Sequence, residues 1–121
     1  MIGYVTMGTN DLARAAKFYD ELLKGIGAGR VMESERFVAW ATGPGQPMLL
    51  AMTPFNKEPA TVGNGMMVSL AVGSQENVDA MYKKAISLGS KDEGAPGNRG
   101  GSFYGAYCRD LDGNKICFFT M

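Results

Sequence analysis

The sequence predicts an α+β fold in which two tandem β-α-β-β-β repeats form a curved mixed sheet around a concave cavity, with the helices on the outer face. Two amphipathic helical stripes begin near Asn10 and Gln75, an offset of 65 residues. Strand-like segments that begin at 48 and 115 are offset by 67 residues, which agrees within boundary error. The 121 residues are too few for two independent cores, so we expect one domain, with repeat halves at about 1–55 and 65–121 and a connector at 54–65.

The first half opens with a short apolar strand that ends at Thr9-Asn10-Asp11, polar residues suited to capping a helix. Apolar residues then recur at three- and four-residue spacing and predict a helix from Leu12 to about Gly25. Three strands are expected at about 29–33, 36–41 and 48–53, the last two joined by a Gly- and Pro-rich turn into a hairpin.

The second half repeats this order after a connector rich in Pro, Gly and Asn. We expect a strand at 66–72, a helix capped by Ser74 that stops at Gly89, and a short strand at 90–93. A glycine-rich loop at 94–101 follows, interpreted either as a mobile flap or as an ordinary flexible loop. A closing hairpin joins strands 102–109 and 115–121 through a turn at 110–114.

Charge and composition exclude several classes of function. Twelve Lys and Arg balance twelve Asp and Glu, so no overall basic field exists to hold nucleic acid or an anionic membrane, and we expect neither partner. Histidine is absent, which removes the commonest general base and the commonest metal ligand. Two cysteines and nine methionines suit a reducing compartment, so we expect a cytoplasmic location and free thiols.

Several side chains are candidates for a binding site. Aromatic rings that can stack on a flat ligand are offered by Tyr4, Trp40, Phe103, Tyr104 and Tyr107, against the alternative that most of them are sheet core. Strand alternation puts Phe103 and Tyr107 on one face and Tyr104 on the other, unless a bulge at Gly105 intervenes. Arg99 offers a fork for a carboxylate or phosphate. Cys117 is either a reactive thiol or a buried, inert one, and the apolar residues around it favour the second. With a four-residue turn it would oppose Ala106.

The order of these motifs resembles the vicinal oxygen chelate superfamily, which includes glyoxalase I, bleomycin-resistance proteins and extradiol dioxygenases. The resemblance covers nearly the whole chain and rests on the helix motif N-D-L-x-R-A-x-x-F-Y-x-x-L-L at 10–23 and on D-L-D-G-N-K-I at 110–116. It implies the tandem-repeat fold and a homodimer. In metal-using members it also implies His or Glu ligands on the first and last strands of each half.

The corresponding positions of this chain are Tyr4, Leu49, Met67 and Cys117. None is an imidazole or a carboxylate, so we expect neither the family's metal nor another cofactor. A soft Cu(I) pair of Met67 and Cys117 is the remaining metal hypothesis, and packing is the favoured alternative.

These patterns predict a protein that binds a small organic molecule in an aromatic cavity without a metal and without assigned catalytic residues. The alternative is a lyase, isomerase or dioxygenase-like enzyme whose metal is held by residues not identified from the sequence. The expected ligand-binding residues are Tyr4, Trp40, Leu49, Met67, Arg99, Tyr104 and Cys117.

Overall fold

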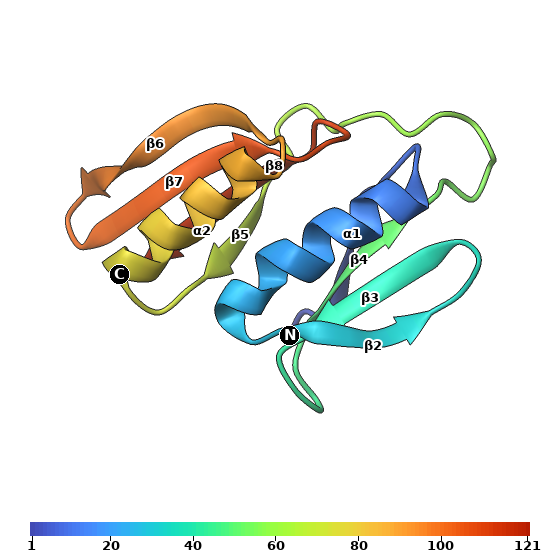
Figure 1. Cartoon of the computed structure of the whole chain (residues 1–121), viewed down its shortest axis with the longest axis horizontal. Coiled ribbons are helices and arrows are strands. Elements are labelled where there is room, and N and C mark those ends of the chain that lie inside the picture. The colour runs from blue at the N-terminus through green and yellow to red at the C-terminus, as the bar shows by residue number, and fades with distance from the viewer. The chain divides into compact units, whose positions relative to one another are not determined.

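The computed structural model describes residues 1–121, and the chain forms two compact units, which we call the first half (Met1–Val62) and the second half (Gly63–Met121). Each half has one α-helix and one four-stranded mixed sheet, in the order β-α-β-β-β (Figure 1). The α+β class and the repeated β-α-β-β-β order are therefore confirmed.

In the first half, the sheet has the strand order β1-β4-β3-β2, with β1 parallel to β4 and the other pairs antiparallel. The predicted hairpin of β3 and β4 is present. The elements are β1 (Tyr4–Gly8), α1 (Leu12–Leu22), a 3-10 turn (Leu23–Ile26), β2 (Gly29–Glu33), β3 (Phe37–Ala41) and β4 (Met48–Met52).

Helix α1 forms for the reasons that its sequence suggests. The Asp11 carboxylate accepts a hydrogen bond from the Arg14 amide and so satisfies one of the free N–H groups of the first turn. Residues at three- and four-residue spacing, among them Ala15, Tyr19 and Leu22, are buried against the sheet. Gly27 closes the helical segment with a left-handed φ of 70°, which glycine adopts without steric cost.

The second half has the same topology, with the strand order β5-β8-β7-β6 and β5 parallel to β8. Ser74 caps its helix by accepting a hydrogen bond from the Asn77 amide, and Val78, Met81 and Ala85 form the buried stripe. The elements are β5 (Val68–Ala71), α2 (Gln75–Ser87), β6 (Lys91–Gly100), β7 (Phe103–Arg109) and β8 (Lys115–Thr120).

The prediction of a glycine loop at 94–101 was wrong for most of its length. Strand β6 continues to Gly100 and pairs with β7, with register shifts after Asp92, Gly94 and Asn98. Such bulges let a glycine-rich strand keep its pairing where a regular ladder would fail. Arg99 therefore extends from a strand.

The cross-strand partner of Cys117 also differs from the expectation. The last pair of β7 and β8 is Arg109 with Lys115, so the turn has the five residues expected at 110–114. Cys117 therefore lies opposite Tyr107, whereas its expected pairing with Ala106 assumed a four-residue turn. Cys108 pairs with Ile116, and because adjacent strand residues point to opposite faces, the two cysteines face opposite sides of the sheet. Both thiols are free and buried, as predicted.

Neither helix combines the length and the apolar character that a membrane-spanning helix needs.

Candidate functional site

The second sheet has one face that packs against α2 and one that points away from it. The Tyr104 hydroxyl donates a 2.7 Å hydrogen bond to Asp79 of α2, so the Tyr104 side chain lies on the helix side of the sheet. Because side chains alternate along a strand, the other even-numbered residues of β7 point to the same side. Tyr107 and its cross-strand neighbour Cys117 therefore point to the other side. We call this surface the Tyr107 face; it comprises Ser69, Arg99, Phe103, Tyr107, Lys115, Cys117 and Phe119.

Two cations lie over the Tyr107 ring. The Arg99 guanidinium carbon is 5.3 Å and the Lys115 ammonium nitrogen 5.5 Å from the ring centroid. Both distances allow cation–π attraction. Neither Arg99 nor Lys115 forms a salt bridge. An acidic group on which Lys115 does act is Glu93, whose carboxylate accepts a 2.9 Å hydrogen bond from Arg109 and whose pKa is lowered first by Arg109 and further by Lys115.

Gly94 makes this stacking sterically feasible. A Cβ atom at Gly94 would lie 2.9 Å from Cδ2 of Tyr107 and 3.2 Å from Nη2 of Arg99, both closer than ordinary contact. Arg99 also donates a hydrogen bond through Nη2 to the Ala95 carbonyl oxygen, which holds the side chain against its own strand. The glycine-rich composition of β6 thus provides space for an arginine beside a tyrosine.

Cys117 lies beneath these groups and is completely buried. Burial raises the pKa of its thiol, since the thiolate loses hydration, while the hydrogen bond with Ser69 and the charges of Arg99 and Lys115 act in the opposite direction. Because burial dominates, the protonated thiol is the stable form near neutral pH.

The Phe103 and Phe119 rings extend the apolar part of the Tyr107 face. Their centroids are 5.1 Å apart and their planes differ by 5°, a stacked pair. The face therefore combines flat apolar area with two cations, a combination that suits an organic anion.

The structure brings two of the predicted site residues, Arg99 and Cys117, to this face. Tyr104 is on the α2 side, where its bond to Asp79 raises the pKa of its phenol. Tyr107, an aromatic candidate that was left out of the expected ligand-binding residues, lies on this face instead. Met67 precedes β5 and is 42% exposed.

The first half also has a helix face and a face that points away from the helix. Trp40 is 1% exposed on the α1 side, where its indole N–H donates a 2.9 Å hydrogen bond to Asp20 and its ring lies 5.5 Å from that of Tyr19. Leu49 pairs with Trp40 and therefore shares its side of the sheet. Trp40 and Leu49 therefore pack toward α1 and not on the side of the sheet that points away from the helix, where they were expected. Tyr4 is 60% exposed.

Asp20 predicts a pH dependence of stability. Two hydrogen bonds from Arg30, at 2.9 and 2.7 Å, lower the pKa of the Asp20 carboxyl, and the bond from Trp40 adds to this effect. A carboxyl whose pKa is lower in the folded state stabilises the fold above its ordinary pKa of 3.8, and this contribution is lost as the pH falls through the folded pKa. Urea unfolding at pH 7, 4 and 3 should therefore show a smaller loss of stability in Arg30→Gln than in the wild type. Identical losses would contradict this assignment.

The residues present do not fit the metal that the fold family implies. The residues at the four inferred ligand positions offer a phenol, a thioether, a protonated thiol and an aliphatic side chain. These are not the imidazole and carboxylate ligands that Zn²⁺, Fe²⁺ or Ni²⁺ prefer. No group of three or more His, Cys, Asp or Glu side chains in the structure is arranged to hold a metal ion.

Thiol labelling distinguishes a reactive from an inert cysteine. Burial raises the pKa of the Cys108 thiol from its usual 9.0 to about 11 and also raises that of Cys117. Because the thiolate is the nucleophile, neither cysteine should react with a disulfide reagent within minutes at pH 8, and both should react once the chain is unfolded in urea. In Cys108→Ala, rapid labelling of the folded protein would show that Cys117 is reactive and would overturn this interpretation.

Comparison with known proteins agrees with this architecture. A family model described as the Glyoxalase/Bleomycin resistance protein/Dioxygenase superfamily matches residues 1–118. The crystal structure of a glyoxalase/bleomycin resistance protein from Albidiferax ferrireducens T118 is 38% identical, with a TM-score of 0.92 over 100% of this chain and 98% of that chain. No match was found among curated proteins.

More distant structures share the fold. A hypothetical protein from S. aureus is 24% identical, with a TM-score of 0.75 over 100% of this chain and 93% of that chain. Lactoylglutathione lyase from Agrobacterium tumefaciens is 22% identical, with a TM-score of 0.73 over 99% of this chain and 92% of that chain.

Two β-α-β-β-β halves, each with one helix and a four-stranded mixed sheet, define the protein as a tandem-repeat α+β protein. The chain belongs to the Glyoxalase/Bleomycin resistance protein/Dioxygenase superfamily.

Proposed function

We propose that this protein binds a small organic anion on the Tyr107 face and does so without the metal of its family. The observation that carries the proposal is the pair of cations, Arg99 and Lys115, over one tyrosine ring without a salt bridge to either. The chain as a whole has no net charge, so this positive charge is a local feature of the face. An anionic group of the ligand would supply the missing negative charge.

The two cations would contribute in different ways. Arg99 already uses Nη2 on the Ala95 carbonyl, and its remaining N–H groups form a planar fork suited to a carboxylate or phosphate. Lys115 would add a point charge from β8. Tyr107 and the stacked pair of Phe103 and Phe119 would cover the apolar part of the ligand.

The chemistry of the face favours binding over catalysis. Its thiol is buried and its pKa is raised, so it offers no nucleophile at neutral pH. The relatives include a glyoxalase/bleomycin resistance protein and a lactoylglutathione lyase. Similarity at 22% identity to a lactoylglutathione lyase supports the fold alone.

The proposed state is a homodimer in the cytoplasm. Strand β2 is an edge strand and all five of its residues are exposed, so it carries unpaired backbone groups that a second copy could cover. Two free thiols suit a reducing compartment.

Binding of 8-anilinonaphthalene-1-sulfonate, a fluorescent aromatic anion, tests the proposed face. We expect saturable binding, and we expect Arg99→Gln to weaken it about tenfold because a charge-assisted hydrogen bond is lost. Gly94→Ala should also weaken it, since the new methyl group displaces Tyr107 and Arg99 without removing a charge.

The exposed Arg14 of α1 and Lys91 of β6 provide matched controls. Arg14→Gln and Lys91→Gln should leave the dissociation constant unchanged, which separates a local site from a general effect of net charge. Equal affinity in wild type and Arg99→Gln would exclude the Tyr107 face as the site.

A further inference from the structure

The first half has an open pocket of about 650 Å³ that the Tyr107 face does not include. Its walls are the turn between β1 and α1, the residue Arg36 that immediately precedes β3 in the sequence, and the segment at 53–59 that follows β4. Strands β1 and β4 are parallel, so their carboxyl ends meet at this edge of the sheet. Ligands of open sheets often bind beyond the carboxyl ends of parallel strands, and the volume lies within the range of small-molecule sites.

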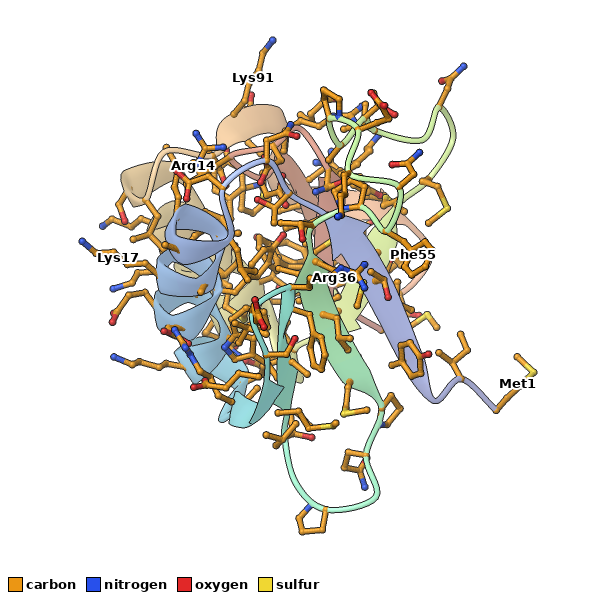
Figure 2. The ribbon with its side chains drawn as sticks, turned by 90° about the vertical axis from the view of Figure 1, so that its right-hand side faces the viewer. Met1, Arg14, Lys17, Arg36, Phe55 and Lys91 are labelled. Atoms are coloured by element: carbon orange, nitrogen blue, oxygen red, sulfur yellow. The ribbon has the colours of Figure 1, made fainter.

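Arg36 is held in a defined position at this pocket. Its Nη2 donates a 3.1 Å hydrogen bond to the Thr53 carbonyl oxygen, and its guanidinium carbon is 5.3 Å from the centroid of the Phe55 ring. Phe55 is 86% exposed, a large apolar ring with little protein over it. Figure 2 shows Phe55 on the opposite side of the first sheet from Arg14 and Lys17 of α1, with Arg36 between them.

The segment after β4 is fixed by its own contacts. The Asn10 side chain bonds the backbone of Ala60 twice, accepting from its N–H at 2.6 Å and donating to its carbonyl oxygen at 3.2 Å. The Lys57 amide donates to the Pro54 carbonyl oxygen at 3.1 Å, and Lys57 is the only non-glycine residue with a positive φ, at 63°. This conformation is costly for lysine, and strained residues of this kind concentrate at ligand sites.

The charges around the pocket are unpaired. Neither Arg36 nor Lys57 forms a salt bridge, and Glu58 is the one acidic residue in the lining, so the lining carries a net charge of +1. The ring of Phe55 and the prolines at 54 and 59 supply an apolar surface beside these charges.

We propose that this pocket is a second binding site, for a small carboxylate with a flat apolar body. The carboxylate accepts hydrogen bonds from the N–H groups of Arg36 that Thr53 does not use, Lys57 adds positive charge, and the apolar body packs on Phe55. The site lies wholly within the first half and does not depend on ligand binding at the Tyr107 face.

Benzoate is a suitable probe for this site in the full chain. In a titration followed by ¹H–¹⁵N NMR, we expect saturable shifts at the amides of 9–10, 36 and 53–58. Benzamide, the neutral analogue, should bind about tenfold more weakly because it lacks the charge. Equal affinity for the two, or shifts confined to residues elsewhere, would overturn the proposal.

Three substitutions give different expected changes in benzoate affinity. Arg36→Gln should weaken binding about tenfold, whereas Glu58→Gln should tighten it, since a repelling charge is removed. Lys57→Asn should weaken binding without loss of stability, because asparagine tolerates the left-handed backbone better than lysine does. Unchanged affinity in Arg36→Gln and Glu58→Gln would refute the site.

Arg99→Gln should leave benzoate binding at this pocket intact. This control distinguishes a failure of the proposed Tyr107 face from a failure of the proposed pocket.

Discussion

Replacing Trp40 with alanine is expected to lower the free energy of unfolding by about 3–5 kcal/mol, the usual cost of removing a buried aromatic side chain. Trp40 is 1% exposed, packs on Tyr19 and donates its indole N–H to Asp20. The substitution leaves a cavity between β3 and α1 and removes one of the partners of Asp20. Urea unfolding followed by circular dichroism measures this change.

Tyr4→Ala is the matched control in the same sheet. Tyr4 is 60% exposed, so the loss should be about 0.5 kcal/mol or less. This pair of variants tests whether Trp40 is core or site. A loss below about 1 kcal/mol for Trp40→Ala would contradict its assignment to the core.

Asp110→Ala is expected to lower the free energy of unfolding by about 2–3 kcal/mol. The Asp110 carboxylate is almost fully buried and accepts three hydrogen bonds, from the amide of Asp112 at 2.9 Å and from the amide and side chain of Asn114 at 2.8 and 2.9 Å. Alanine would leave these donors without that acceptor. Affinity for the fluorescent anion should fall as well, because this five-residue turn sets the register that places Tyr107 opposite Cys117.

Asp110→Asn is the conservative control for this turn. Its amide oxygen can still accept from the two backbone amides that bond Oδ1, whereas its NH₂ group cannot accept from the Asn114 side chain. The loss should be about half of that for alanine. Equal losses for the two variants would show that the backbone bonds to Oδ1 contribute little.

The periodicity of apolar residues was sufficient to predict both helices and the repeated order of the elements. Both helices were predictable because their apolar stripes and caps are local features, and the offset between the two stripes indicated the repeat. Strand β6 was not predictable in the same way. Its sequence lacks the alternation of apolar and polar residues that indicates a strand. Its continuation to Gly100 depends on pairing with β7, which is a non-local interaction.

The site was harder to predict because side chains alternate across a strand. Leu49 and Leu50 point to opposite faces, so an uncertainty of one residue in the repeat offset decides whether the chosen leucine packs on α1 or points away from it. Likewise, pairing Cys117 with Ala106 assumed a four-residue turn, whereas the five-residue turn at 110–114 pairs Cys117 with Tyr107. The turn expected at 110–114 has five residues and, counted in this way, indicates Tyr107 as the aromatic residue beside Cys117.

The pocket at Arg36 gave no signal in the sequence. The segment after β4 was interpreted as a plain connector because it is rich in Pro, Gly and Asn. The pocket depends on two contacts between residues that are distant in the sequence. Asn10 holds the backbone of Ala60, 50 positions later, and Arg36 donates a hydrogen bond to the Thr53 carbonyl oxygen. Neither contact follows from local pattern.

Native mass spectrometry of freshly purified protein, prepared without added metal, distinguishes metal-free anion binding from a metal-dependent enzyme. We expect each subunit to retain or take up an organic anion, Arg99→Gln to reduce this occupancy, and no metal to be bound in stoichiometric amount. One metal ion per subunit, retained in Arg99→Gln, would contradict metal-free binding at the Tyr107 face and would favour the metal-dependent enzyme instead.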